Sequence, residues 1–413
     1  MLTNELFGQI LDFIFFILPI IIPVLLLILL FNLWVDYARS KFISEQENVL
    51  LKIIPPRDVF KTPAAMELVI EAFYQTAGES DFRKKYWKGG VRAWFSLEMV
   101  SNGGIVNFYI WTRKAFVRYI QSQLHAQYPG IEVSESEDYS EKIDYLSGDY
   151  KLWGLEYELT DADPIPIKTY IDYNLDKVAK EEEKVDPITS TLEYLASLKP
   201  GESAWLQILI RAHKKEDKDP NKWFGKTDNW KNNANKEIKK IREDSFFEFE
   251  GADNIQKMPM ATKGQNEKIA AIERSISKTP FDVGMRGIYL AEKDIFDPVN
   301  IGAIVSSFKH YSSSSLNGFK PGIKTSVTDW KDPFGYELKR IEHEILDAYR
   351  ERGYFWRDFR KNWWSFCKEK RKVFILNSEE LATIFHLPGT VSQTPSVERV
   401  QSKRQDPPAE LPI

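Results

Sequence analysis

Three consecutive residues near the middle of the chain, Gly225-Lys226-Thr227, match the end of a phosphate-binding loop. The complete loop, G-x-x-x-x-G-K-[ST], surrounds nucleotide phosphates with backbone N–H groups and begins with a glycine. In this chain Pro220 stands where that first glycine belongs. The sequence therefore does not predict an ATP site at this loop.

Other reactive side chains lack partners at the spacing that catalysis requires. The sequence contains neither G-x-S-x-G nor H-E-x-x-H, the motifs of serine hydrolases and zinc proteases. Cys367 is the only cysteine, which excludes an internal disulfide and a cysteine-based zinc site. The acidic run from Glu132 to Asp144 lacks the periodicity of a calcium loop, so we expect a solvated loop there. The histidines are scattered along the chain at His125, His213, His310, His343 and His386. We predict a binding or scaffolding module without enzyme activity, cofactor or metal.

Two segments combine basic side chains with large aromatic ones, a pattern that suits contacts with phosphates and stacking on bases. Residues 211–242 hold 11 Lys or Arg against 5 Asp or Glu, and residues 354–372 read YFWRDFRKNWWSFCKEKRK. The net charge of -4 gives the whole chain no attraction to nucleic acid, so binding would depend on these local patches. The candidate nucleic-acid or partner contacts are Arg357, Arg360, Lys361, Trp363, Trp364, Lys368, Arg371, Lys222, Trp223, Lys226 and Trp230.

Both segments have a structural interpretation as well. For residues 211–242 we favour a solvated helical insertion whose tryptophans pack on the domain. Residues 354–372 could equally form an amphipathic helix that buries its aromatic side chains, lie on an anionic membrane surface, or dock a partner protein.

The elements that would carry these segments begin with a membrane helix. Phe13 to Val35 is almost unbroken apolar sequence, long enough to cross a hydrocarbon core of about 30 Å. A cleaved signal peptide is less consistent, because Met1–Asp12 contains no Lys or Arg. Arg39 and Lys41 follow the span, so the positive-inside rule predicts a single-pass protein of the inner (cytoplasmic) membrane with its body in the cytoplasm. The expected anchor residues are Phe13, Pro19, Pro23, Leu30, Trp34 and Val35.

One pattern occurs twice and determines the expected fold. In Val91–Val100 apolar residues alternate with polar ones, as in a strand with one buried face. Asn102-Gly103-Gly104 is a tight turn, Ile105–Trp111 is the return strand, and a helical stripe runs from Phe116 to Leu124. The second occurrence begins at Ser203. Its residues Ala204, Trp205, Leu206, Ile208 and Ile210 align with Ala93, Trp94, Phe95, Leu97 and Met99.

With Val49–Ile54 as an opening strand and Ile131–Val133 as a closing one, the first unit has the order βαββαβ of a ferredoxin-like domain. Either Tyr150–Leu159 or Ile165–Tyr173 would open the second unit. We therefore predict an α+β fold with one N-terminal transmembrane helix, then two tandem ferredoxin-like repeats, the second with a helical insertion. The expected parts are residues 1–45 (tail and transmembrane helix), 46–180 (first repeat), 181–376 (second repeat) and 377–413 (a short helix and a linker).

Three long stretches resemble one family, the large membrane-anchored proteins of small-genome candidate-phylum bacteria that carry a type IV secretion or conjugation-type motor ATPase at the C-terminus. The stretches are IIPPRDVFKTPAAMELVIEAFYQTAGE, WFSLEMVSNGGIVNFYIWTRKAFVRYIQSQLHAQYPGIEVSESEDY and FILNSEELATIFHLPGTVSQTPSVERVQSKRQDPPAELPI. In that family the last stretch leads into a HerA-like P-loop ATPase. In this chain it runs to Ile413, so the resemblance carries over no ATP site.

The resemblance implies a non-catalytic membrane-anchoring and assembly module of a translocation ATPase involved in protein secretion or DNA transfer. Its expected partners are a separate P-loop ATPase and other secretion-channel proteins, in an oligomeric assembly. The alternative is a membrane-tethered nucleic-acid-binding protein that uses residues 211–242 and 354–372.

Overall fold

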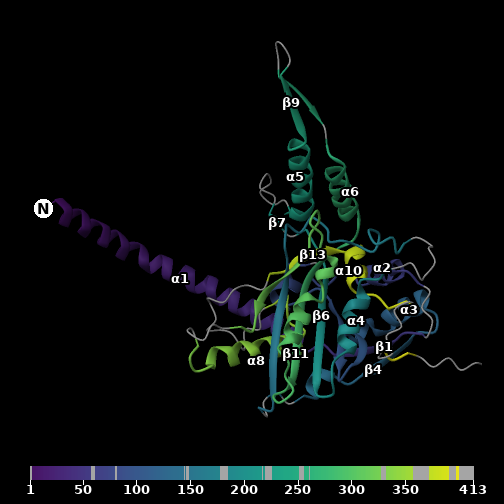
Figure 1. Cartoon of the computed structure of the whole chain (residues 1–413). Helices are drawn as coiled ribbons and strands as arrows, with labels where there is room; N and C mark the ends of the chain where they lie inside the picture. Colours follow the sequence, from purple (N-terminus) through teal and green to yellow (C-terminus); the bar gives the residue numbers. More distant parts are fainter. Residues whose placement is uncertain are drawn as a thin grey trace, which may run out of the picture. The chain divides into compact units, whose positions relative to one another are not determined.

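The computed structural model describes residues 2–56, 61–79, 81–143, 145, 148–176, 185–215, 217–218, 226–250, 255–259, 261–326, 332–356, 372–389 and 397–399. These residues form two units, which are described separately. The first unit contains the long helix α1 (Leu2–Ser44) and the short π-helix η1 (Arg83–Trp87). α1 stays helical through Pro19 and Pro23 (Figure 1).

The second unit is built on one large antiparallel sheet. In the described part of the chain nine strands join in this sheet, in the order β12-β5-β11-β6-β2-β3-β1-β4, with β13 pairing to β11. The strands are β1 (Asn48–Ile54), β2 (Trp94–Asn102), β3 (Ile105–Arg113), β4 (Glu132–Ser136), β5 (Tyr150–Leu159), β6 (Glu202–Ala212), β11 (Pro280–Glu292), β12 (Phe319–Lys324) and β13 (Phe374–Asn377).

The helices of this unit connect the strands in two successive runs of the same type. The first run is β1-α2-β2-β3-α3-β4 and the second is β5-α4-β6-β11-α7-β12. In each run the fourth strand lies beside the first, the first beside the third, and the third beside the second. The second strands of the two runs, β2 and β6, pair along their length and make the sheet continuous. The helices are α2 (Pro63–Ala72), α3 (Val117–Gln127), α4 (Ile188–Ala196), α7 (Val299–Ser306), α8 (Tyr336–Arg350) and α10 (Ser378–Ile384).

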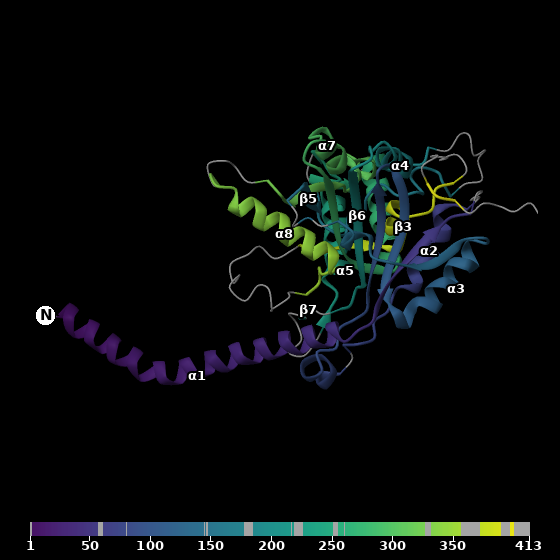
Figure 2. The ribbon, with the colours of Figure 1, turned by 90° about the horizontal axis from the view of Figure 1, so that it is seen from below.

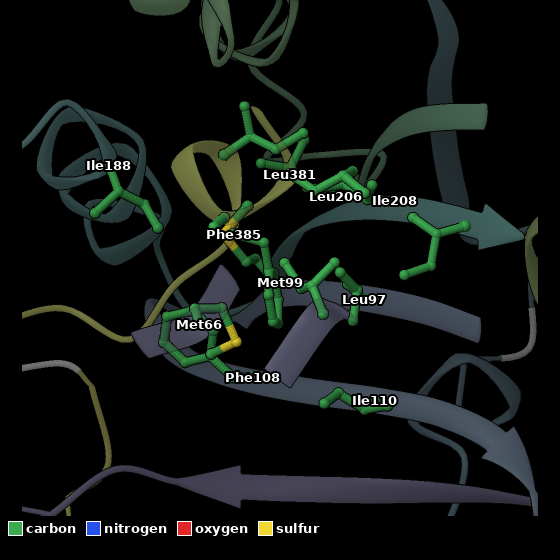
Figure 3. Packing of buried hydrophobic residues seen from close by; sticks show 14 of the residues in the cluster. Met66, Leu97, Met99, Phe108, Ile110, Ile188, Leu206, Ile208, Leu381 and Phe385 are labelled. Carbon is green, nitrogen blue, oxygen red and sulfur yellow. The ribbon is translucent and has the colours of Figure 1, made fainter. Parts of the chain in front are cut away.

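The hydrophobic core lies on one face of the sheet. The alternating apolar residues of the strands point to this face, as period-two patterning requires, and α2, α3, α4, α7 and α10 pack on them. α2 and α3 lie side by side (Figure 2). Figure 3 shows Leu381 of α10 and Phe385, which follows α10, among the side chains of the central strands, including Met99 and Leu206. The C-terminal helix is therefore part of the core.

The opposite face of the sheet is covered by α8 and the residues that follow it. A Cβ on Gly154 of β5 would lie 2.9 Å from Ile345 of α8, and one on Gly284 of β11 would lie 2.4 Å from the ring of Tyr354. Only glycine allows such a close approach at these two positions. Both faces of the central strands are thus buried.

A helical arm is inserted between β6 and β11. α5 (Asn229–Glu243) and α6 (Lys263–Ser277) run side by side away from the sheet, with the hairpin β9 (Phe246–Glu250) and β10 (Ile255–Pro259) beyond them (Figure 1). The short strands β7 (Asp217–Lys218) and β8 (Lys226–Thr227) precede α5.

The sequence prediction of a mixed α+β fold with an apolar N-terminal helix is confirmed. The strand that opens the second run is β5, whereas Ile165–Tyr173 forms turns. β5 precedes the boundary expected at residue 180 and pairs with β11 and β12 of the second run. Part of the expected C-terminal linker also contacts the sheet, since Val397 bridges to Val106 of β3.

Candidate membrane anchor and basic surface

α1 exposes an apolar run of a length that suits a membrane. The run extends from Ile20 to Phe31. Apart from Pro23, each of its residues has a large hydrophobic side chain and is 40–69% exposed. Moving apolar surface out of water is favourable by about 25 cal/mol per Å², so this run suits apolar surroundings. By length and composition, one helix in the described part of the chain could cross a membrane, and it is this one.

The expected anchor residues divide into three groups. Leu30 is 67% exposed and Trp34 is 42% exposed, and Pro19 and Pro23 are exposed as well. The side chain of Phe13 lies outside the described residues. Val35 is only 5% exposed, and Ala38, one helical turn later, is 6% exposed. Val35 is therefore buried at the end of the span, and its role as an anchor residue stays a prediction.

Most of the aromatic and basic segment at residues 354–372 falls outside the described residues. This applies to Arg357, Arg360, Lys361, Trp363, Trp364, Lys368 and Arg371. Its first residue, Tyr354, is 5% exposed, and its ring lies 4.8 Å from the guanidinium of Arg286. The start of the segment is thus a packing element of the sheet rather than an open surface.

The candidate contacts of the arm fall partly outside the described chain too, where Lys222 and Trp223 lie. Lys226 belongs to β8, but its side chain is not described. Trp230 is 3% exposed, and its indole N–H donates to the carbonyl oxygen of Asp163 at 3.4 Å. A buried indole cannot stack on a base, so Trp230 is removed from the candidate surface, in line with the structural interpretation of this segment.

The basic surface of the arm is formed by lysines that the sequence did not single out. Trp230, Ala234 and Ile238 recur every four residues and form the buried stripe of α5, and α6 contributes Ile269 and Ile272 to the same small core. Helical geometry then turns the residues between them toward solvent. The exposed lysines of α5 are Lys231, Lys236, Lys239 and Lys240. The sequence signal that could have identified these lysines was the helical spacing of the apolar residues in 230–238, which determines the face that is exposed.

A buried polar network lies between the sheet and the turn after α8. The Glu98 carboxylate, fully buried on β2, accepts hydrogen bonds from Ser96 at 2.6 Å, Gln207 at 3.1 Å and Tyr139 at 2.7 Å. The guanidinium of Arg352 donates to both oxygens of Glu98, at 3.1 and 3.2 Å. Each of these four donors is within hydrogen-bonding distance of Glu98, so the carboxylate is well compensated for its burial.

The charges around Arg352 shift pKa values in the direction expected for an ion-paired cluster. Burial alone would raise the pKa of Asp138, but hydrogen bonds and the positive charge of Arg352 hold it below its usual 3.8. Burial would lower the pKa of Arg352, yet Glu98 and Asp138 raise it well above its usual value. Asp138 and Arg352 therefore form an ion pair at neutral pH, which stabilises the packing of α8. Among the residues described, no group of three or more His, Cys, Asp or Glu could hold a metal ion.

In comparisons with known proteins, no protein-family model and no curated sequence matches this chain.

Proposed function

We propose that this chain is a non-catalytic, membrane-anchored assembly module of a translocation ATPase of the type IV secretion or conjugation type. The observation that carries the proposal is the exposed apolar run of α1, which requires a lipid environment. The chain passes from α1, which ends at Ser44, to β1, which begins at Asn48. A protein that binds the second unit is thereby recruited to the inner membrane, on its cytoplasmic side if the basic residues after the span set the orientation.

The second unit, in this proposal, consists of two tandem ferredoxin-like repeats. Each run of elements is βαββαβ, and the strand order of each half of the sheet is the one that this fold has. The sequence alignment of the two repeats makes Leu97 and Ile208 equivalent. These two residues face each other directly in the pairing of β2 with β6, which is the register that a two-fold relation between the repeats would give.

The partner in this proposal is a separate P-loop ATPase, together with other secretion-channel proteins. Its support is the resemblance of the three stretches quoted above to anchored motor ATPases. Residues 374–387 of the last stretch form β13, α10 and a segment buried in the core of the second unit. Residues 374–387 therefore belong to the folded body of the second unit, and in this proposal they connect that body to the motor.

The test is purification of the tagged full-length chain from its native membranes in mild detergent, with an unrelated single-span protein carrying the same tag as the control. We expect a P-loop ATPase to be recovered in stoichiometric amount with this chain and not with the control, and ATP hydrolysis to follow that partner. Recovery of the chain alone, without ATP hydrolysis, would contradict the proposal.

A second candidate function, nucleic-acid binding, is favoured by the basic face of α5. Neutralising several phosphates releases counterions, so binding should weaken steeply as salt rises. The experiment compares the full-length chain in detergent with a variant in which Lys231, Lys236, Lys239 and Lys240 are replaced by Gln. Salt-dependent DNA binding that the variant loses would support this function. Binding that is undetectable, or insensitive to salt, would exclude it.

A further inference from the structure

A short segment that lies beside α1 in the first unit has the composition of a membrane-interface contact. Residues 81–88 read DFRKKYWK and include η1. Phe82 is 69% exposed and Trp87 is 68% exposed. Four basic residues, Arg83, Lys84, Lys85 and Lys88, alternate with these aromatic ones, against the single acid Asp81.

The segment is fixed to α1 by ring contacts and by its backbone. The ring of Tyr86 lies 5.8 Å from that of Phe31, and the ring of Trp87 lies 5.7 Å from that of Trp34. Gly89, in the left-handed region with φ 63°, brings the backbone so close that a Cβ there would lie 2.2 Å from the carbonyl of Ala38. The segment therefore packs closely against α1 from the end of the apolar run onward.

The base of the segment is held by a buried ion pair. The guanidinium of Arg92 lies 3.2 Å from the carboxylate of Glu79, and the two side chains are 2% and 8% exposed. The backbone N–H of Gly90 also donates to the carbonyl oxygen of Lys84 at 2.7 Å. These contacts hold the two ends of the segment together. The exposed aromatic side chains lie between those ends.

The depth of these contacts follows from helix geometry. At a rise of 1.5 Å per residue, Trp34 lies about 30 Å along α1 from Phe13, which is the thickness of a hydrocarbon core. Trp and Tyr side chains concentrate at this level because one end of each ring prefers lipid and the other prefers water. Tyr86 and Trp87 contact residues of α1 at this same level.

We propose that residues 81–88 form a second membrane contact, in which Phe82, Tyr86 and Trp87 insert among lipid headgroups while Arg83, Lys84, Lys85 and Lys88 bind the phosphates of an anionic leaflet. The exposed aromatic rings then lie in a medium that suits them, and the basic side chains meet the surface charge of the cytoplasmic leaflet. The contact would fix the rotation of α1 about its axis, which a single span leaves free. This inference rests on the proposed insertion of α1 but not on the ATPase partner.

The experiment places a fluorescent label at single positions of the full-length chain reconstituted in vesicles. Cys367→Ser removes the native thiol, and Asp81→Cys or Leu25→Cys receives the label. The vesicles are phosphatidylcholine, with or without about one third phosphatidylglycerol, and contain lipids that carry a nitroxide quencher either near the headgroup or in the middle of the acyl chain. We expect strong quenching of the label at residue 81 by the headgroup nitroxide, and of the label at residue 25 by the mid-chain nitroxide.

The two labels distinguish failure of the inference from failure of the proposed anchor. If the label at 25 is quenched and the label at 81 is not, α1 inserts but the second contact does not exist. If neither is quenched, the membrane anchor itself is wrong. Quenching at 81 that disappears as protein density rises would mean that a second copy of the chain covers the segment, which also overturns the inference.

Matched variants test each part of the contact. Phe82→Ser with Trp87→Ser should reduce the headgroup quenching at residue 81 at least about twofold, because the aromatic rings hold the segment at the interface. The control is Phe334→Ser with Tyr336→Ser, which removes two rings that are 80% and 77% exposed elsewhere in the chain and should change nothing. Replacing Arg83, Lys84, Lys85 and Lys88 by Gln should abolish the preference for phosphatidylglycerol, which is measured as stronger headgroup quenching at residue 81 in the vesicles that contain this lipid. An unchanged preference would contradict the role of the basic side chains.

Discussion

Arg352 occupies a backbone conformation in which glycine is the usual residue. It follows the C-cap of α8 with φ 48°, and its N–H donates to the carbonyl of Tyr349 while that of Gly353 donates to Ala348. This is the hydrogen-bonding pattern of a Schellman motif, with arginine at the left-handed position. An arginine stands there because its side chain reaches Glu98 and Asp138. The left-handed backbone aims the guanidinium at a buried carboxylate on a strand 254 residues away.

Two substitutions distinguish the contribution of the Arg352 side chain from the cost of its left-handed backbone conformation. Arg352→Ala should lower the free energy of unfolding by about 3–5 kcal/mol, since Glu98 is left buried without its positive partner. Arg352→Gly loses the same pair but relieves the left-handed strain, so it should cost about 1 kcal/mol less than alanine. Urea unfolding of the detergent-solubilised full-length chain measures both. As a control, Lys263→Gln on the exposed surface of α6 should change stability by less than about 0.5 kcal/mol. If Arg352→Gly lowers the free energy of unfolding as much as Arg352→Ala does, the left-handed backbone at this position is not strained.

A buried histidine gives the core a dependence on pH. Both ring nitrogens of His386 face oxygen atoms, the carbonyl of Ala382 at 2.9 Å and the carboxylate of Asp186 at 3.0 Å. Burial alone would lower the pKa of His386, but Asp186 and the backbone acceptors raise it above 6.5. Burial would raise the pKa of Asp186, but the positive charge and hydrogen bond of His386 lower it below 3.8. The ion pair thus stabilises the fold at neutral and mildly acidic pH.

The sign of the pH effect follows from these shifts. Because the pKa of His386 is higher in the folded state, its stabilisation is complete below pH 6.5 and is lost as pH rises through the raised value. Unfolding of the full-length chain in detergent, measured from pH 6 to 9, should show stability falling. His386→Gln should be less stable at pH 6, by about 3–5 kcal/mol if the whole buried pair is lost, and its stability should fall less steeply with pH. A residual fall is expected from Glu380, because burial raises the pKa of this carboxyl to about 8. A variant with the same slope as the parent chain would mean that another group is responsible.

Sequence reasoning found few of these residues, for a physical reason. A strand or a cap has a local pattern, but the network of Glu98, Gln207, Tyr349 and Arg352 joins residues that only the folded sheet brings together. The alternation in Val91–Val100 predicts a strand with one buried face, and Glu98 lies on the other face. It faces away from the apolar core, yet α8 and the turn after it bury that face. Alternation determines which face a side chain takes, not what covers the face.

At the scale of elements, patterns with strong local signals were reliable. The predicted hairpin from Val91 to Trp111 is β2 and β3, and the predicted helix near residues 378–386 is α10. The second helix of the arm was not predicted, although Thr262 and Gln265 form a capping box at its start. The choice between Tyr150–Leu159 and Ile165–Tyr173 stayed open because both are rich in apolar residues. Only pairing with β11 decides it.

α10 depends on a cap that also ties it to the arm. The side chain of Asn377 accepts from the N–H of Glu380 at 2.9 Å, and its amide donates to Ser275 of α6 at 3.0 Å. Glu380 in turn accepts from the N–H of Asn377, which completes a capping box in a buried setting. The structure thus identifies Asn377 as the N-cap of α10.

Loss of this cap should be measurable. Asn377→Ala should destabilise the chain by about 2 kcal/mol, because a cap is lost and buried polar groups remain unpaired. Asn377→Ser keeps an uncharged cap acceptor and loses the amide donor to Ser275, so it should cost about half as much. Thermal unfolding of both variants in the same detergent provides the comparison. Equal losses would show that the contact with Ser275, and not the cap, is what matters.

For the second unit as a whole, the important feature is the pairing of β2 with β6. Leu97 and Ile208 are equivalent in the sequence repeat, lie opposite each other in this pairing, and are 1% and 0% exposed. The core is continuous across this seam, and α10 packs on strands of both runs. The arm, by contrast, packs around a small separate cluster, to which Ile165 from outside the arm also contributes. The two runs should therefore unfold together, and the arm should open separately.

Amide hydrogen exchange on the full-length chain in detergent tests this division. Ile208→Ala removes packing at the seam and should cost about 2–5 kcal/mol. If the repeats form one cooperative unit, the protected amides of β3 in the first run and β11 in the second should accelerate by the same factor, since both exchange through one global opening. Ile238→Ala, in the arm, should accelerate exchange in α5 and α6 while β3 and β11 keep their rates. Acceleration in β11 alone after Ile208→Ala would show that the halves open independently. The seam would then be a docking contact between two autonomous domains, and a partner could bind by separating them.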